Sequence, residues 1–584
     1  MLVSALVSEP RWTSWRPACD RAPCHVRLPP RRRSETVPRP LDPITISVVQ
    51  HRLSAIVEEM GEAMLRTSYS QILNASRDFS IAICDTRCRL IAQADHIPVH
   101  VGALPWAVRA VEDKFQGAVR PGDVVLLNDP STGGSHLPDV TAFVPVFGEG
   151  VRRYWAVVRA HMSDIGGATH GAYNPAATEI WQEGLRIPPL KLYDAGTLRD
   201  DVLDLIALNV RFPRDFRGDL AAMIGAAHLG EQRIARLFGE VGADRVDEAV
   251  EAILDGAERR TRVVVGGWAD GIYRGEAFLD DDGRGREDVR IVATVTKSGS
   301  DIAVDLSESD PQSASFANSS HANMQAAVAM AFAYLIDPDI PKNDGCFRPL
   351  SVTARKGSVV WADDAAPVTL CTTHPANEIV EAIVKALSLA CPERAMGGWS
   401  RRFRISITGD NPRTGKPFIW HMFHARPGGG ASPRGDGWSA AGEWHSVGGI
   451  KFGSVEVAEA RFPLRFETHE FRPGSGGDGQ HRGGLGTAMD LVVEVPAYAH
   501  TAGEGARHGS AGMLGGRDGA PHDYRIVSQD GERTLRTKEF GISIAAGDRL
   551  AVRSAGGGGW GPPERRAPED RQRDREREMT DERA

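Results

Sequence analysis

Two histidines and an aspartate lie in two short stretches whose spacing could build a metal site. His136 and Asp139 form a His-x-x-Asp pair in the loop-like stretch "NDPSTGGSHLPDV", residues 128–140, and His161 ends the strand-like run "YWAVVRAH". If "VTAFVPVF" and "YWAVVRAH" pair as a hairpin, the start of the first strand meets the end of the second, and the three side chains come together. Two imidazoles and one carboxylate leave positions open on a divalent Mn, Fe or Zn ion, as in catalytic sites. Such an ion could polarise a carbonyl group or lower the pKa of water.

A purely structural explanation of these residues also stays open. A histidine in a loop is more often a hydrogen-bonding residue than a metal ligand, and Asp139 could simply cap a turn. Two further polar residues follow: Asp164 in "MSDIGG" and His170 in "GATHGAYNP". Each could orient a ligand or contact the substrate, or belong to a solvated loop.

Upstream, "SRDFSIAICD" and "AQADHIPVHVGALP" add four more polar residues. His96 and His100 have the spacing of a helical ligand pair, but Pro98 between them excludes a helix that carries both. Together with Arg77 and Asp78, we expect them in a substrate-facing loop, with plain packing as the alternative. His100 is a candidate for proton transfer or substrate contact, as are Asp164 and His170.

Other catalytic arrangements find no support in the sequence. The glycine runs "GGGASPRGDGW" and "SAGGGGWG" lack the strand, loop, Lys and Ser/Thr order of a nucleotide loop. There is no Gly-x-Ser-x-Gly elbow. We therefore expect this chain neither to bind ATP nor to act as a serine hydrolase, and we interpret "GQHRGGLG" as structural, with tight turns that place strands.

Composition narrows the class of protein further. The 584 residues carry a net charge of -8 and include 41% hydrophobic residues, and the basic residues are scattered rather than clustered. Nucleic acid and membrane are therefore not expected partners, since the apolar stretches are also too short to span a bilayer. Seven cysteines without a Cys-x-x-Cys motif favour a reduced, cytoplasmic protein.

The predicted helices and strands that position these residues indicate a mixed α/β (α+β) fold. Asp42 and Pro43 begin an amphipathic helix. Strand-like runs then surround the candidate site, and after a helical stretch the chain returns to mixed α/β patterns and ends in a Gly-rich β part. We predict several subdomains with mixed sheets: 1–40, a disordered or mis-annotated extension; 41–197, the metal-site part; 198–265, an inserted helical part; 266–400, an α/β part; 401–563, the Gly-rich β part; and 564–584, a charged tail.

The order of these motifs resembles a known family. "SRDFSIAICD", "GDVVLLNDP", "GGSHLPDVTAFVPVF", "RAHMSDIGG", "FRPGSGGDGQHRGGLG" and "AGGGGWGPP" are similar, in sequence and in order, to the hydantoinase B/oxoprolinase family, from about Asp42 to Pro563. Two departures stand out. Cys88 follows "AICDTR" where the family usually carries a glycine, and Ser76 replaces the acidic residue that commonly precedes "RDFS".

The resemblance implies a function for the chain. It implies a B-type subunit of an ATP-dependent hydrolase that acts on C–N bonds of cyclic amides of the hydantoin or 5-oxoproline class. A hydantoinase A-like ATPase partner would bind ATP and phosphorylate the ring amide, in a hetero-oligomer. The metal ligands of the carboxylase branch fall here on His136, Asp139 and His161. Two alternatives remain: the large subunit of an acetone-type carboxylase, distinguished by a bicarbonate requirement, and a non-catalytic scaffold for the ATPase.

Overall fold

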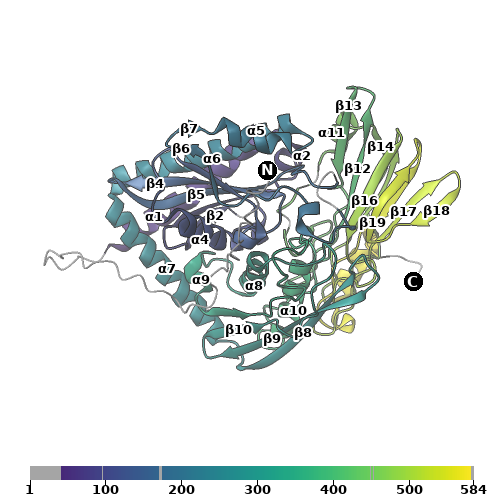
Figure 1. Cartoon of the computed structure of the whole chain (residues 1–584). Coiled ribbons are helices and arrows are strands. Elements are labelled where there is room, and N and C mark those ends of the chain that lie inside the picture. The colour runs from purple at the N-terminus through teal and green to yellow at the C-terminus, as the bar shows by residue number, and fades with distance from the viewer. Residues whose placement is uncertain (1–40, 95, 170–173, 448, 452, 581–584) are drawn as a thin grey trace, which may run out of the picture. The chain divides into compact units, whose positions relative to one another are not determined.

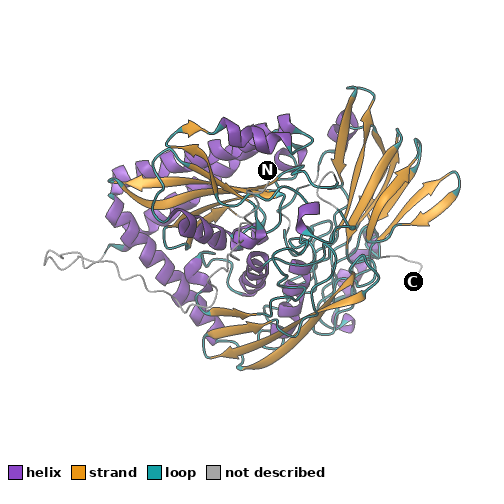
Figure 2. Ribbon diagram, in the orientation of Figure 1, coloured by secondary structure: helices purple, strands orange, loops and turns teal. Residues whose placement is uncertain are grey.

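A computed structural model describes residues 41–94, 96–169, 174–447, 449–451 and 453–580 of the chain, so the predicted extension 1–40 lies outside the described residues. Residues from Asp42 onward pack as one unit. Four sheets and the helices that cover them make up this unit, so the predicted mixed α/β class is confirmed (Figures 1 and 2). Among the described helices, none has both the length and the apolarity needed to cross a bilayer.

The first sheet is antiparallel and carries the candidate site at one end of its central hairpin. Its strands run in the order β2-β1-β5-β4-β3-β6-β7. Asp139 lies opposite His161 in the pairing of β4 with β5, so the predicted hairpin is confirmed. The strands are β1 (Phe79–Asp85), β2 (Leu90–Ala94), β3 (Val124–Leu127), β4 (Asp139–Gly148), β5 (Val151–His161), β6 (Leu190–Asp194) and β7 (Thr197–Leu198).

Helices cover both faces of this sheet. Side chains alternate along β5: Trp155 belongs to a buried cluster with residues of α4, whereas Tyr154 stacks on Phe238 of α6. Asp42 caps α1 as predicted, because its carboxylate accepts a 2.9 Å hydrogen bond from the Thr45 backbone N–H. The helices are α1 (Pro43–Thr67), α2 (Gln71–Asn74), α3 (Pro98–Gly102), α4 (Leu104–Phe115), α5 (Asp200–Leu208), α6 (Pro213–Val241) and α7 (Ala243–Gly266), with one-turn helices η1 (Pro130–Thr132) and η3 (Ile180–Gln182).

The turn between β1 and β2 explains one departure from the family pattern. Cys88 has a φ of 64°, in the left-handed region that glycine adopts at least cost. A glycine is therefore the ordinary choice at this position, and the cysteine is tolerated there at some strain. Cys84 and Cys88 are both free thiols.

The second sheet supports the helices that reach the candidate site. Its order is β11-β10-β9-β8, and α10 packs on β8 and β9. A Cβ at Gly275 would lie 2.0 Å from the Ala382 carbonyl oxygen, so this glycine lets β8 and α10 approach closely. The elements are β8 (Gly271–Asp281), β9 (Glu287–Ser298), β10 (Asp301–Asp305), β11 (Leu350–Thr353), α8 (His321–Leu335), α9 (Asp344–Phe347) and α10 (Pro375–Leu387).

Beyond Arg401, two antiparallel sheets pack face to face around one hydrophobic core, as the strand-like runs of this region predict. Trp420 from one sheet and Met489 from the other are fully buried in this core. The elements are β12 (Phe403–Asn411), β13 (Lys416–His421), β16 (Ala497–Gly503) and β19 (Lys538–Ile544) in one sheet, β14 (Leu464–Phe471), β15 (Thr487–Val493), β17 (Asp523–Ser528), β18 (Gly531–Thr534) and β20 (Arg549–Arg553) in the other, and helix α11 (Val455–Arg461).

The glycine-rich motifs pack backbone against backbone. Successive N–H groups of residues 556–559 donate to four carbonyls of three other segments, at Ala520 and Arg517, Gly484, and Gly398. A Cβ at Gly483, in "GQHRGGLG", would lie 1.9 Å from the Gly557 carbonyl oxygen. The tight-turn interpretation of this motif is therefore wrong, since it is the close approach of neighbouring chains that excludes side chains.

The charged tail contains a short helix, α12 (Pro568–Glu576), which follows the one-turn helix η4 (Pro563–Arg565). Asp574 in this helix is buried and pairs with Arg566 at 2.6 Å and Arg482 at 3.4 Å. The helix is therefore anchored to the glycine-rich region by ion pairs rather than solvated on all sides.

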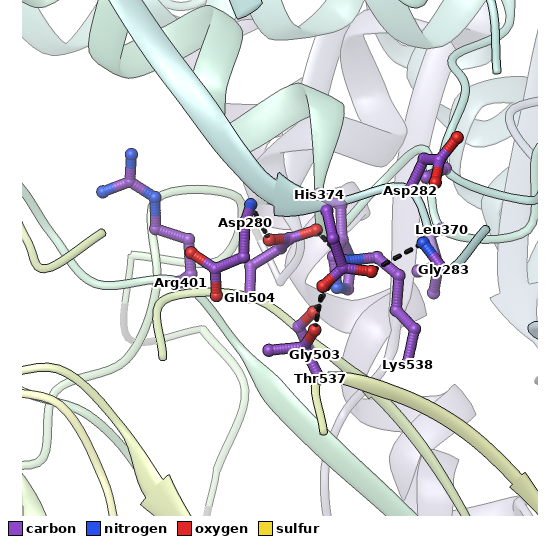
Figure 3. A network of polar contacts seen from close by, with 12 residues as sticks. Asp280, Asp282, Gly283, Leu370, His374, Arg401, Gly503, Glu504, Thr537 and Lys538 are labelled. Atoms are coloured by element: carbon purple, nitrogen blue, oxygen red, sulfur yellow. Dashed lines mark hydrogen bonds and ion pairs between the residues drawn. The ribbon is translucent and has the colours of Figure 1, made fainter. Parts of the chain in front are cut away.

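A buried polar network joins β8 to the C-terminal sheets (Figure 3). Lys538 pairs with Glu504, and the other oxygen of Glu504 accepts a 2.6 Å hydrogen bond from the Asp280 backbone N–H. Thr537 donates to Asp281 at 2.5 Å. Because every one of these groups has a partner, the network fixes the end of β8 against β16 and β19.

Candidate functional site

The hairpin brings His136, Asp139 and His161 together. The Asp139 Oδ1 atom lies 2.9 Å from His136 Nε2 and 3.2 Å from His161 Nδ1, and the two ring nitrogens are 3.1 Å apart. One ligand atom from each residue lies within 4.8 Å of the others, which is the spacing of a metal-binding group. The sequence-based expectation that these three side chains converge is thus met in the geometry.

Strand pairing and one long-range contact position the three side chains. Asp139 begins β4 and His161 ends β5, on the sheet face that α3 and α4 cover. His136 precedes β4, and its Nδ1 lies 2.5 Å from the backbone carbonyl of Thr369. When Nδ1 donates its proton to that carbonyl, Nε2, which faces Asp139, could offer its lone pair to a metal.

The carboxylate at the centre of the cluster is ionised. Asp139 is fully buried, which raises its pKa, but the neighbouring rings of His100 and His136, together with hydrogen bonds from His136 and His161, outweigh burial and hold the pKa well below its usual range. Ser135 Oγ also donates to Asp139 at 2.5 Å. A buried anion surrounded by imidazoles is an arrangement that suits a divalent cation.

Asp78 and His100 adjoin this cluster. His100 Nε2 lies 3.4 Å from Asp139 and 3.8 Å from Asp78. Both side chains are buried, and burial lowers the pKa of His100 to about 4, so its ring is neutral. His161 N–H donates to the Asp78 carbonyl at 3.0 Å, which places Asp78 directly beside the end of β5.

The predicted loop around His100 is in fact a short helix. Pro98 occupies the first turn of α3 and so begins a helix instead of preventing one. His96 precedes this helix, so the two histidines do not share one, as Pro98 implied. The loop prediction is therefore wrong for His100, because proline is favourable in the first turn of a helix.

Asp164, another predicted site residue, does not join the cluster in the described contacts. Asp164 accepts a 2.7 Å hydrogen bond from the Arg211 backbone N–H and pairs with its guanidinium at 2.9 Å. Those contacts hold the loop after β5, which favours a structural role. His170 lies outside the described residues.

Glu183 is a site residue that sequence reasoning missed. This buried carboxylate accepts hydrogen bonds from the backbone N–H groups of Val368, at 2.8 Å, and Thr369, at 2.9 Å. Burial raises its pKa to about 7 although these bonds oppose the shift. Since the Thr369 carbonyl faces His136, Glu183 fixes the backbone just before the carbonyl that orients a ligand, yet nothing local in the sequence connects residues so far apart.

A cavity of about 470 Å³ lies near the site but is not lined by the cluster. Its wall includes Pro98 and Gly102 of α3 and several small residues of α8, with Lys342, Arg394 and Arg434 also in the lining. The three candidate ligands do not line it. This cavity is therefore separate from the three candidate ligands.

Comparison with known proteins places the chain in a family. The family model for hydantoinase B/oxoprolinase matches residues 42–563. The chain belongs to this family. The resemblance seen in the sequence motifs is thereby confirmed.

Relatives within the hydantoinase B/oxoprolinase family cover nearly the whole chain. The beta subunit of caprolactamase from Pseudomonas jessenii is 35% identical over 536 residues, which span 90% of this chain and 92% of that protein. The B-type subunit of a putative D-/L-hydantoinase from Pseudomonas sp. strain NS671 is 28% identical over 552 residues, with 91% of each chain covered.

Solved structures agree with this placement. The crystal structure of ATP-dependent caprolactamase from Pseudomonas jessenii matches with a TM-score of 0.88 at 32% identity, over 93% of this chain and 95% of that chain. The nucleotide-free structure of an acetone carboxylase matches with a TM-score of 0.84 at 20% identity, over 93% of this chain and 78% of that one. At that identity the second match shows a shared fold alone.

Proposed function

We propose that this chain is the B-type subunit of an ATP-dependent hydrolase of cyclic amides, and that it holds a divalent metal at His136, Asp139 and His161. The observation that carries the proposal is the convergence of these three buried ligands in a relative of the caprolactamase beta subunit. The enzyme class follows from that relative, which is named as part of an ATP-dependent caprolactamase.

The donor set fits Mn, Fe or Zn. Two imidazole nitrogens and one carboxylate oxygen form a mixed N/O set, and the set leaves coordination positions open. The neighbouring Asp78 carboxylate could add an oxygen ligand or orient His161. A metal bound here would supply Lewis-acid polarisation of a carbonyl and would lower the pKa of water.

The chain's own residues would position the ring amide and handle its protons. His100 is neutral and its Nδ1 has no hydrogen-bond partner among the described residues, so it can take up or release a proton at that atom. Burial of the whole cluster keeps bulk water away from an activated intermediate. Asp139 and Asp78 would then hold the neighbouring imidazoles in place.

A separate subunit would bind ATP and use it to activate the substrate. A ring amide is a poor electrophile, and phosphorylation of its oxygen by a hydantoinase A-like ATPase partner would activate it before hydrolysis. The glycine-rich runs of this chain pack against one another and have the wrong residue order for a nucleotide loop. We therefore propose a cytoplasmic hetero-oligomer in which this chain completes the reaction.

Metal content tests the site without any knowledge of the substrate. Elemental analysis of the purified chain should find near-stoichiometric Mn, Fe or Zn, lost in His136→Ala and in His161→Ala and retained in His51→Ala, which changes an exposed histidine of α1. A folded wild-type chain that stays metal-free after Mn, Fe and Zn are added would contradict the proposal and favour a scaffold role.

Turnover tests the reaction class. The chain would be co-expressed with a hydantoinase A-like ATPase, and ATP hydrolysis would be measured with caprolactam, hydantoin, 5-oxoproline, and acetone plus bicarbonate. A ring-opened amino acid as product supports the cyclic amide hydrolase. A carboxylated ketone would instead support the alternative, the large subunit of an acetone-type carboxylase.

A further inference from the structure

Two buried arginines lie together beside the metal-binding cluster. Arg402 and Arg404 are two residues apart at the start of β12, so their side chains leave the same face of the strand. Each is only 4% exposed, and their guanidinium carbons lie 4.5 and 5.5 Å from the centre of the same Phe423 ring. Two buried like charges this close are costly unless anions face them.

The carboxylate beside Arg402 compensates its charge only loosely, because Arg402 Nε lies 3.8 Å from Glu443, which is longer than a good charge-assisted hydrogen bond. Arg404 Nη2 lies 3.5 Å from Asp78, which stabilises its charge. Asp78 also faces His100 of the cluster, so the second arginine borders the metal-binding residues directly.

An unpartnered histidine faces the same region. His445 is 2% exposed, and neither of its ring nitrogens has a hydrogen-bond partner in the described part of the chain. Arg402 Nη1 is likewise without one. His445 is two residues beyond Glu443, which faces Arg402; burial first, and then the charges of Arg402 and Arg404, hold the pKa of His445 well below its usual range.

Buried donors without partners are rare in folded proteins, and a cluster of them points to a ligand. Their charge indicates which kind of ligand. Once a divalent cation offsets Asp78 and Asp139, Glu443 is the carboxylate that remains near Arg402 and Arg404. The net charge of these three side chains is then positive, and a guanidinium group binds phosphate or carboxylate oxygens through paired hydrogen bonds.

We propose that Arg402, Arg404 and His445 form an oxyanion-binding subsite next to the metal cluster. The ligand is a compact oxyanion: the phosphoryl group of an activated substrate, a substrate carboxylate, or bicarbonate. The subsite would hold this group while the reacting carbonyl lies at His136, Asp139 and His161. The positive charge excess and the choice among these anions rest on the function proposed above, whereas the unpartnered donors of Arg402 and His445 do not.

Direct binding tests the subsite separately from turnover. Isothermal titration of the full chain, metal-free and metal-loaded, would use inorganic phosphate, bicarbonate and acetate as probes. We expect saturable binding, with phosphate preferred if the site serves a phosphorylated intermediate. Arg402→Gln, Arg404→Gln and His445→Gln should each weaken binding about tenfold or more, since each removes one buried donor.

Matched variants separate loss of the subsite from loss of the fold. Arg482→Gln removes a buried arginine that pairs with Asp574, and His522→Gln removes a buried histidine that contacts the Arg401 carbonyl. Both should bind the anion as the wild type does. If variants of the three subsite residues do not fold, ³¹P relaxation of phosphate in the Mn-loaded wild type reports whether the anion lies beside the metal.

Two kinds of result would overturn the inference, and a third would refute only the metal site. Wild-type chain that binds none of the three anions, metal-free or metal-loaded, indicates that only water satisfies these donors. Anion binding that the three variants leave unchanged, or that the two controls lose equally, places the anion elsewhere. Anion binding without metal binding would leave the subsite intact and would refute the metal site instead.

Discussion

Replacement of Glu183 by Gln should weaken metal binding although Glu183 touches no metal ligand. Its two carboxylate oxygens accept the backbone N–H groups of Val368 and Thr369, and the Thr369 carbonyl lies 2.5 Å from His136 Nδ1. Glutamine keeps one acceptor and puts an NH₂ group against the other N–H. The backbone at Thr369, whose carbonyl orients His136, must then shift or lose a hydrogen bond.

The size of the effect follows from these contacts. A hydrogen bond to a charged group contributes about 1.5–3 kcal/mol. Loss of a partner that orients a metal ligand typically lowers metal affinity about 10- to 100-fold, which corresponds to about 1.4–2.7 kcal/mol. The two estimates agree, so we expect Glu183→Gln to reduce metal affinity by about one to two orders of magnitude.

Competition of the chain with a fluorescent chelator measures this affinity. The matched control is Asp219→Asn, because Asp219 is also buried and accepts two backbone N–H groups, from Tyr69 at 2.7 Å and Ser70 at 3.1 Å. Both variants should lose stability, but only Glu183→Gln should lose metal affinity. Wild-type metal affinity in a destabilised Glu183→Gln chain would refute the proposed coupling through Thr369.

Three further predictions concern stability. Arg401→Gln breaks a buried cluster with two glutamates of α10 and should lower the free energy of unfolding, measured by urea denaturation, by about 3–5 kcal/mol. The control Arg517→Gln changes an exposed arginine and should lower it by under about 0.5 kcal/mol. Equal losses in the two variants would contradict this prediction. Gly557→Ala should prevent stable folding, as judged by circular dichroism and soluble yield, because its Cβ would lie 2.0 Å from the Gly429 carbonyl oxygen; a native-like variant would show that these chains can separate. Acid should destabilise the chain, because burial holds several histidines neutral in the folded state, whereas the same histidines take up protons at higher pH in the unfolded state. The free energy of unfolding should therefore fall as the pH drops from about 6.5 through about 4, by about 1.4 kcal/mol per pH unit for each such histidine. Urea midpoints that do not change between pH 7 and pH 5 would rule this out. Burial lowers the pKa to about 4 for each of His96, His321, His424, His500 and His522.

Local features of the chain were predictable because they depend on neighbours in sequence. The first helix begins where Asp42 and Pro43 indicate, since capping and proline geometry act within one turn. The hairpin that joins Asp139 to His161 follows from two apolar runs of matching length around a short turn. Its register alone brings two of the three candidate ligands together.

Errors arose where a local rule had two outcomes. Pro98 begins α3 instead of preventing a helix, because proline is unfavourable inside a helix but favourable in its first turn. The glycines of "GQHRGGLG" were assigned to turns, yet Gly483 is needed because another backbone passes within contact distance. A glycine has the same identity in both situations, so the sequence cannot separate them.

The sequence by itself determined the family, the mixed α/β class and the three candidate ligands, because these depend on motif order and on spacing within one hairpin. Only the tertiary structure brought Glu183 and Thr369 to His136, and Arg404 to Asp78. Those contacts join segments hundreds of residues apart, and burial then sets their strength by removing water. Charge and hydrogen bonding across such distances depend on how the sheets and helices pack, which no local pattern records.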